Sequence, residues 1–120
     1  MKIYFAAHST SKDNESEIAS GWKDVELSPT GIEQSVRLKE QTKDMLFDVV
    51  FCSDLQRAVK TAELAWGGMY EIIPDARLRE CNYGKLNGGP SAIVEPMQEE
   101  ECIENRFPEG ESYEDVKARI

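Results

Sequence analysis

The sequence has little of what metal sites and disulfide frameworks require. It contains a single histidine, His8, and three cysteines, Cys52, Cys81 and Cys102, which are irregularly spaced and form no Cys-x-x-Cys pair. Zinc sites draw their ligands from clustered cysteine and histidine residues, so this composition argues against one. An odd number of scattered cysteines is typical of free thiols in a reducing compartment.

Long apolar runs and an excess of positive charge are missing as well. No apolar run approaches the roughly 20 residues that a membrane-spanning helix needs, and the opening run is too short for a secretory signal peptide. The 23 acidic residues outnumber the 14 basic ones and leave a formal charge of −9. Nucleic-acid binding needs a basic surface. We therefore expect a cytoplasmic protein that binds neither a membrane nor a nucleic acid.

What the sequence does contain is an alternation of strand-like and helix-like segments. Short apolar runs predict three strands, and longer segments with helical spacing predict two helices between them. In chain order, the predicted elements are a strand at 2–6, a helix at 29–44, a strand at 47–52, a helix at 54–66 and a strand at 70–73. Such alternation favours an α/β domain with a parallel sheet.

Local signals mark the ends of the two predicted helices. Ser28 is a good N-cap, and Pro29 suits the first helical position. Ile32 and Val36 are spaced to share one face of that helix. Gly67 is a good stop signal for the second helix.

The second half of the sequence is less regular. Residues 82–90 include three glycines and are predicted as a loop, whereas residues 91–105 are predicted as partly helical. Pro96 is expected to begin or break any helix there. Ser112 is a good N-cap for a final helix, which would need more residues than follow it. We therefore expect a single domain over residues 1–120 that is truncated at its C-terminus.

Two residues stand where ligands bind in α/β folds, beyond the carboxyl ends of strands. His8 follows the first predicted strand, and Arg57 lies in the first turn of the helix after the second one. Free backbone N–H groups at a helix start favour an anion, and the planar guanidinium suits a phosphate group. A neutral imidazole can attack phosphorus. A hydrogen-bonded structural role for His8 and a surface role for Arg57 remain alternatives.

Glu80 is a candidate acid for the same chemistry. It follows the third predicted strand and leads into the glycine-containing loop. Attack on a phosphate ester requires a proton for the leaving oxygen, which a carboxylic acid can supply. A surface ion pair with a neighbouring arginine is the alternative role.

Five motifs follow one another in a recognisable order. They are Ile3–Ser9, Gly21–Ser28 with Gly31, Ser53–Ala58 with Thr61 and Ala62, Leu78–Glu80 with Tyr83, Gly84 and Gly88, and Pro108–Ser112 with Val116 and Arg119. In type and order they resemble the motifs of the histidine phosphatase superfamily, the phosphoglycerate-mutase-like proteins. The resemblance covers almost the whole chain.

The resemblance implies a three-layer α/β sandwich with a mostly parallel sheet. It also implies phosphomonoester hydrolysis through a phosphohistidine intermediate on His8, acting on a small phosphorylated substrate with no cofactor and no metal. Arg57 matches a phosphate ligand, and Glu80 matches the proton donor to the leaving group. Asn14 and Ser11 are expected to line the phosphate pocket.

The sequence departs from the family pattern at specific positions. Ala7 stands where the family has an arginine before the nucleophile, and Ser9 stands where it has a glycine. The family's second histidine lies on a later strand, beyond the segment that matches here. Two alternatives therefore stay open, phosphoglycerate mutase-type transfer and a non-catalytic relative that binds phospho-ligands. A sheet without that strand would expose a face, which predicts a homo-oligomer.

Overall fold

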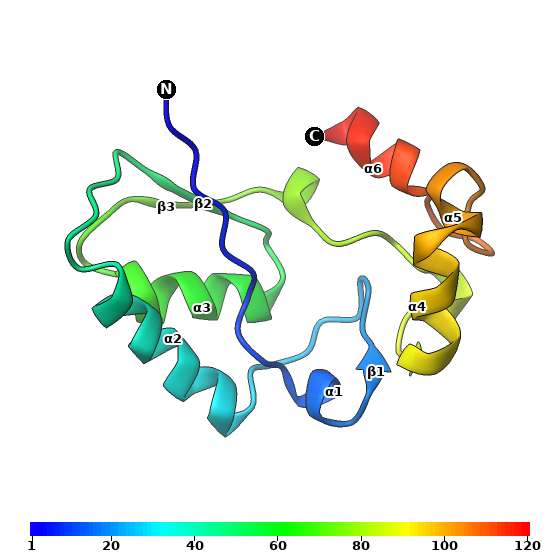
Figure 1. The fold of residues 1–120 in the computed structure, drawn as a ribbon, viewed down its shortest axis with the longest axis horizontal. Helices are drawn as coiled ribbons and strands as arrows, with labels where there is room; N and C mark the ends of the chain where they lie inside the picture. The colour runs from blue at the N-terminus through cyan, green and yellow to red at the C-terminus, as the bar shows by residue number, and fades with distance from the viewer.

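The computed structural model describes residues 1–120 and has two lobes lying side by side (Figure 1). The elements, in chain order, are α1 (Lys12–Glu15), β1 (Ile18–Ala19), α2 (Pro29–Gln41), β2 (Val50–Cys52), α3 (Gln56–Trp66), β3 (Ile72–Pro74), η1 (Ala76–Leu78), η2 (Gly84–Leu86), β4 (Gly89–Pro90), α4 (Ser91–Glu99), α5 (Glu101–Glu104) and α6 (Tyr113–Arg119). One lobe holds α2, α3, β2 and β3, and the other holds α4, α5 and α6. None of these helices combines the length and apolar composition that a bilayer crossing requires.

The strands form two separate sheets of two strands each. β2 and β3 are parallel, with Val50 opposite Ile72, and α3 makes the crossover between them. β1 and β4 are antiparallel, with Ile18 opposite Pro90. The α/β class expected from the sequence is confirmed, and the single parallel sheet is replaced by one parallel and one antiparallel pair.

The predicted strand at residues 2–6 is wrong. This segment runs past β2 and β3 as extended chain and makes no backbone–backbone hydrogen bond. Ile3 and Phe5 are 80% and 94% exposed, and Tyr4, itself 57% exposed, contacts Phe47 with the two ring centroids 5.7 Å apart. A strand is stabilised by pairing with a neighbour, which no local apolar pattern can provide. The segment has the composition of a strand without the partner.

The sequence signals for α2 and α3 are confirmed. The Ser28 hydroxyl accepts a hydrogen bond from the backbone N–H of Gly31 at 3.1 Å, and Pro29 occupies the first turn. Gly67 caps the end of α3. Gly31 has to be a glycine, because a Cβ atom there would lie 2.0 Å from the carbonyl oxygen of Thr10. This contact brings the start of α2 against the segment that follows His8.

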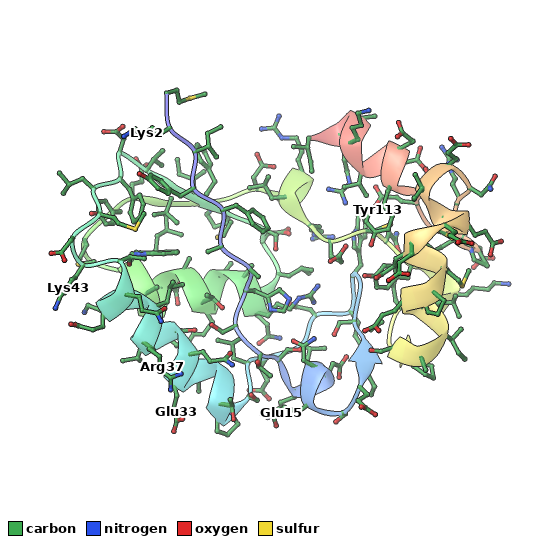
Figure 2. The ribbon with its side chains drawn as sticks, viewed as in Figure 1. Lys2, Glu15, Glu33, Arg37, Lys43 and Tyr113 are labelled. Carbon is green, nitrogen blue, oxygen red and sulfur yellow. The ribbon has the colours of Figure 1, made fainter.

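The predicted face of α2 lies in contact with solvent. Ile32 and Val36 share a face, as their spacing indicates, and are 43% and 53% exposed. Figure 2 shows the side chains of Glu33 and Arg37 also pointing away from the molecule. The buried positions of this helix are Gly31 and Ser35, and Ser35 is fully inaccessible to solvent.

A hydrophobic cluster forms the core of the second lobe. Its buried residues are Cys81, Tyr83, Val94, Cys102 and Phe107. Around them pack partly buried side chains from α4 and α6, including Met97 and Tyr113. Figure 2 shows Tyr113 at the start of α6, where Ser112 forms the predicted N-cap as part of a capping box.

The expectation that Pro96 begins or breaks a helix is wrong, because it lies inside α4. A proline in a helix interior removes one backbone hydrogen bond and clashes with the preceding turn. Here the burial of neighbouring apolar side chains offsets the free-energy cost of the proline. Val94 is completely buried, and Met97 packs against the core. Tertiary packing thus overrides the local preference.

Candidate active site

A pocket of about 130 Å³ lies between the two lobes and brings together residues far apart in the sequence. Its lining includes His8, Asn14, Arg57 and Glu80, four of the five residues singled out from the sequence. The remaining lining includes the apolar residues Ile18 and Ala19 of β1 and the polar residues Ser91, Glu95 and Gln98 of α4. The volume is below the roughly 300–1,000 Å³ of pockets that take drug-sized ligands, so it fits a small group such as a phosphate ester.

The imidazole of His8 is oriented by the backbone of the next residue. Its Nδ1 atom lies 2.7 Å from the carbonyl oxygen of Ser9. A carbonyl can only accept, so Nδ1 carries the proton and Nε2 keeps a free lone pair. Loss of water around the ring lowers the pKa of His8 below 6.5, and the charge of Arg57 acts in the same direction, while the Ser9 bond and Glu80 oppose it. The ring is therefore neutral at pH 7, the form that acts as a nucleophile.

The residue after the histidine is anchored to both neighbouring helices. The backbone N–H of Ser9 donates to the hydroxyl of Thr61 in α3 at 3.0 Å. The hydroxyl of Ser9 lies 2.8 Å from that of Ser35 in α2, and Thr61 donates in turn to the carbonyl of Arg57. All of these groups are buried, so this network holds His8 in place relative to Arg57.

Arg57 is buried at the start of α3, and two backbone carbonyls hold its guanidinium. Nη2 donates to Gly21 at 2.8 Å, and Nη1 donates to Lys23 at 3.1 Å. A guanidinium carries five N–H donors, so others remain for an anion in the pocket. Burial lowers the pKa of Arg57, with Glu80 opposing this effect, and the group keeps its charge at neutral pH.

Gly21 makes this arrangement possible. Its φ of +57° belongs to the left-handed region, and a Cβ atom would lie 2.0 Å from Oδ1 of Asn87. That same oxygen accepts the backbone N–H groups of Trp22 at 3.1 Å and Tyr83 at 2.9 Å. Asn87 therefore ties the turn that holds Arg57 to the loop that follows Glu80.

Contacts from three directions fix the Glu80 segment. Oε1 of Glu80 accepts the backbone N–H of Cys81 at 2.7 Å. The Glu80 carbonyl oxygen accepts from Nε1 of Trp22 at 2.8 Å and from Nη2 of Arg119 at 3.0 Å. Arg79 pairs with Asp54 at 2.6 Å and stacks 4.8 Å from the centroid of the Trp22 ring. These contacts fix the backbone of Glu80, the residue whose side chain lines the pocket.

The two remaining predicted residues have different positions. Asn14 lines the pocket, and its Oδ1 accepts the backbone N–H of Ser11 at 2.9 Å, which leaves its amide nitrogen free for a ligand. Ser11 is fully buried, does not line the pocket and serves as the N-cap of α1. The expectation that Ser11 lines the pocket is therefore wrong, because its hydroxyl is held in a capping box with Asn14.

One wall of the pocket was not foreseen from the sequence. Ser91, Glu95 and Gln98 of α4 line it, and Gln98 donates to the hydroxyl of the buried Tyr83 at 2.6 Å. Their spacing of four and three residues is the signal of one helical face. The proline within that segment obscured the signal, because it argued against a continuous helix.

The sequence pattern of the histidine phosphatase superfamily (branch 1) matches residues 3–120. The chain belongs to the histidine phosphatase superfamily. Fructose-2,6-bisphosphatase TIGAR B of Danio rerio is 36% identical over 81% of this chain. The 2,3-bisphosphoglycerate-dependent phosphoglycerate mutase of Streptococcus mutans is 37% identical over 73% of it. The chain spans 41% of the length of each of these two relatives.

Solved structures of the superfamily have the same fold as this chain. A mycobacterial glucosyl-3-phosphoglycerate phosphatase superposes with a TM-score of 0.80 at 28% identity, covering 93% of this chain and 56% of its own. Superfamily members similar to this chain thus include both phosphatases and mutases.

The superfamily's arginine before the nucleophile has no counterpart here, since Ala7 is at that position. Arg57 is consequently the one cationic side chain of the lining. The serine that replaces the superfamily's glycine is fully accommodated, because Ser35 of α2 pairs with the hydroxyl of Ser9.

Proposed function

We propose that the site in this chain hydrolyses small phosphate monoesters in the cytoplasm through a phosphohistidine intermediate on His8. The observation that carries this proposal is that His8, Arg57 and Glu80 line one small pocket. A nucleophile, an anion ligand and a carboxyl group are the three kinds of group that this reaction requires.

The roles follow from the geometry of each side chain. Nε2 of His8 attacks phosphorus while the bond from phosphorus to the ester oxygen breaks, and Glu80, in its protonated form, gives its proton to the departing alcohol. Water then attacks the phosphohistidine, gives a proton to Glu80 and releases inorganic phosphate. Arg57 stabilises the charge on the phosphoryl oxygens, and the Asn14 amide donates a further hydrogen bond.

The finer architecture is part of the same proposal. We expect the whole protein to form the three-layer sandwich around a mostly parallel sheet, as a single domain that extends past this chain. The lengths of the relatives support this, because the chain spans 41% of two of them. We expect the rest of the pocket to contain the further phosphate ligands of the superfamily.

Two alternatives have specific support. The similarity to a phosphoglycerate mutase favours phosphoryl transfer between positions of a phosphoglycerate. The single cationic side chain of the lining favours a non-catalytic member that binds phospho-ligands. Removing one charge-assisted ligand of a transferred phosphoryl group costs about 3 kcal/mol of transition-state stabilisation, or roughly a hundredfold in rate.

The deciding experiment is hydrolysis of an aryl phosphate by this chain and by the His8→Ala and Glu80→Gln variants, with acid-labile phosphoprotein measured in parallel. We expect turnover and phosphoprotein in the parent chain and neither in His8→Ala. We expect Glu80→Gln to slow turnover of esters with poor leaving groups most, because those need the proton.

Glu99→Gln is the matched control for Glu80→Gln, since Glu99 is exposed and lies outside the pocket. Turnover that survives in His8→Ala would overturn the assignment of the nucleophile. A folded chain without turnover that still binds phosphate would favour the non-catalytic alternative. Interconversion of phosphoglycerates in place of phosphate release would favour the mutase.

A further inference from the structure

Asn87 makes hydrogen bonds to two loops that are far apart in the sequence. Its Oδ1 atom accepts the backbone N–H of Trp22 at 3.1 Å and that of Tyr83 at 2.9 Å. Trp22 lies in the Trp22 loop, residues 20–28 between β1 and α2, which Figure 1 shows reaching between the two lobes. Tyr83 lies in the Glu80 loop, residues 79–83 between η1 and η2. One oxygen atom therefore joins the two loops.

The Trp22 loop is attached to α3, the helix that carries Arg57. The guanidinium of Arg57 donates to the carbonyl oxygens of Gly21 at 2.8 Å and Lys23 at 3.1 Å. Oδ1 of Asp24 accepts the backbone N–H of Gln56, the first residue of α3, at 2.9 Å. The loop and the phosphate ligand thus belong to one unit.

His8 belongs to the same unit. The residue that follows it, Ser9, donates its backbone N–H to the hydroxyl of Thr61 in α3 at 3.0 Å. Thr61 lies one helical turn after Arg57 and donates to the Arg57 carbonyl oxygen at 2.7 Å. The proposed nucleophile and the phosphate ligand are therefore both held by α3.

The Glu80 loop is attached to the second lobe. Cys81 and Tyr83 are part of the buried core of that lobe. Oε1 of Glu80 accepts the backbone N–H of Cys81 at 2.7 Å, so the orientation of the carboxyl group follows the backbone of this loop. The proposed acid and the proposed nucleophile consequently lie on different units, which Asn87 joins.

The other end of the Asn87 carboxamide determines how it is oriented. Nδ2 donates to Oδ1 of Asn82 at 2.8 Å, and that oxygen also accepts the backbone N–H of Gly84 at 2.9 Å. An oxygen in the place of Nδ2 would face another acceptor, so one orientation of the amide satisfies all of these bonds. Oδ1 is thereby directed at the N–H groups of Trp22 and Tyr83.

We propose that Asn87 is a positioning residue for phosphoryl transfer, which holds the carboxyl group of Glu80 at a fixed distance from His8 and Arg57. This inference rests on the proposed roles of those three side chains. The acid has to meet the ester oxygen while the phosphoryl group is bound, and a displacement of about 1 Å can lower the rate by about a hundredfold. Asn87 does not line the pocket and acts through the two loops that it joins.

His8 reports this distance without turnover, because it is the only histidine and both charges act on it. Arg57 lowers the pKa of His8, and Glu80 raises it. In an NMR titration we expect Glu80→Gln to lower the pKa of His8 and Arg57→Gln to raise it. In an Asn87→Ala background we expect the Glu80→Gln shift to fall to about half, as it would if the separation of the charges doubled. We expect the Arg57→Gln shift to remain, because His8 and Arg57 stay attached to α3.

Turnover measures the consequence for the reaction. A displaced acid matters most for esters with poor leaving groups, because those depend on the donated proton. We expect Asn87→Ala to slow hydrolysis of glycerol 3-phosphate about tenfold more than hydrolysis of para-nitrophenyl phosphate. Equal slowing of the two esters would overturn the positioning role.

Thr42→Ala is the matched control, because the Thr42 hydroxyl accepts from Nε1 of Trp66 at 2.9 Å and lies outside the pocket. We expect it to leave both NMR shifts unchanged. Asn87→Asp keeps an oxygen for the two backbone N–H groups, and we expect it to retain more of the Glu80→Gln shift than Asn87→Ala does. If Asn87→Ala does not fold, Asn82→Ala takes its place, since it removes the acceptor that orients the carboxamide.

The outcomes distinguish this inference from the function on which it rests. An unchanged Glu80→Gln shift in the Asn87→Ala background overturns the positioning role and leaves the proposed function intact. Equal reduction of the Glu80→Gln and Arg57→Gln shifts also overturns it, because the variant would then have loosened the whole site. The expected NMR shifts without turnover in the parent chain overturn the proposed function and leave Asn87 as the residue that sets this distance. Absence of both shifts in the parent chain overturns both proposals, since neither charge would then lie near His8.

Discussion

Nη2 of Arg119 donates a hydrogen bond to the backbone carbonyl oxygen of Glu80 at 3.0 Å, across 39 residues of sequence. The same guanidinium pairs with Glu111 at 2.8 Å and donates to the carbonyls of Arg77 and Arg79. Arg119 and Glu111 are both only 19% exposed. The final helix of the chain thus supports the segment that presents Glu80 to the pocket.

Arg119→Lys should destabilise the protein. Lysine keeps the charge, but its single ammonium cannot reach Glu111 and the row of carbonyls together, so backbone acceptors are left without partners. We expect the free energy of unfolding in urea to fall by about 1–3 kcal/mol. Arg106→Lys is the matched control, since Arg106 is 71% exposed in its pair with Asp115, and we expect little change there. Equal losses in both variants would contradict the supporting role of Arg119.

His8 should titrate below pH 6.5. Loss of water around the ring lowers the pKa of His8, so the ring is still mostly neutral when the pH has fallen to 6.5. The unfolded chain then binds the proton more readily than the folded chain. The free energy of unfolding should therefore decrease only as the pH falls below 6.5, the pKa of the unfolded chain. Because it is the only histidine, its imidazole proton resonances in an NMR titration need no assignment.

The charge of the Arg57 guanidinium also lowers the pKa of His8, and the variant Arg57→Gln removes this charge. We expect the pKa of His8 to rise in this variant, because the protonated ring no longer meets a neighbouring cation. A titration of the parent chain at or above pH 6.5 would count against the environment described for His8. An unchanged midpoint in Arg57→Gln would show that the two groups are not coupled.

Ser35→Ala should weaken the anchor of the histidine segment. It leaves the buried hydroxyl of Ser9 without its partner in α2, which costs about 1–3 kcal/mol of unfolding free energy. The double variant Ser9→Gly, Ser35→Ala should recover part of this loss, because neither unpaired hydroxyl remains. Thr30→Ala, an exposed hydroxyl deletion in the same helix, is the control. Additive losses in the double variant would show that the two hydroxyls do not interact.

The exposed apolar side chains of the first lobe predict self-association. Ile3, Phe5 and Phe51 are 80%, 94% and 58% exposed, and they lie on the N-terminal segment and on β2. Apolar groups left in contact with water favour association through that surface. We expect sedimentation velocity to show a concentration-dependent oligomer that the double variant Phe5→Ser, Phe51→Ser dissociates.

The control for self-association is the double variant Ile32→Ser, Val36→Ser on the outer face of α2, where the two apolar side chains are 43% and 53% exposed. A monomer at all concentrations would contradict the prediction. Equal dissociation by both double variants would show that the association does not depend specifically on the surface around Phe5 and Phe51.

Helix boundaries could be predicted from the sequence because each signal lies within a few residues. Ser28 and Ser112 act as the N-caps that their types indicate, and Gly67 ends α3. The order of the motifs identified the superfamily for a related reason, since glycines and caps recur wherever the same backbone has to be built. Gly31 illustrates this, because no other residue fits against Thr10.

The candidate site was predictable in part. His8, Arg57 and Glu80 were found from their places after predicted strands and from the motifs, and they do line one pocket. Ser11 was included for its position in the same turn, yet its hydroxyl is committed to an N-cap. The pocket wall formed by Ser91, Glu95 and Gln98 was missed because Pro96 argues locally against a continuous helix. Packing of Val94 into the core stabilises the helix by more than the proline destabilises it.

The sequence by itself determined the α/β class, the starts of the helices and the superfamily, because these depend on local backbone preferences and on residues read in order. Only the tertiary structure decided which apolar segments pair, which are left exposed and which polar groups meet. Residues 2–6 show the physical reason most plainly. Their composition suits a strand, but a β-strand forms only when it makes hydrogen bonds with a neighbouring strand. That pairing depends on residues distant in the chain.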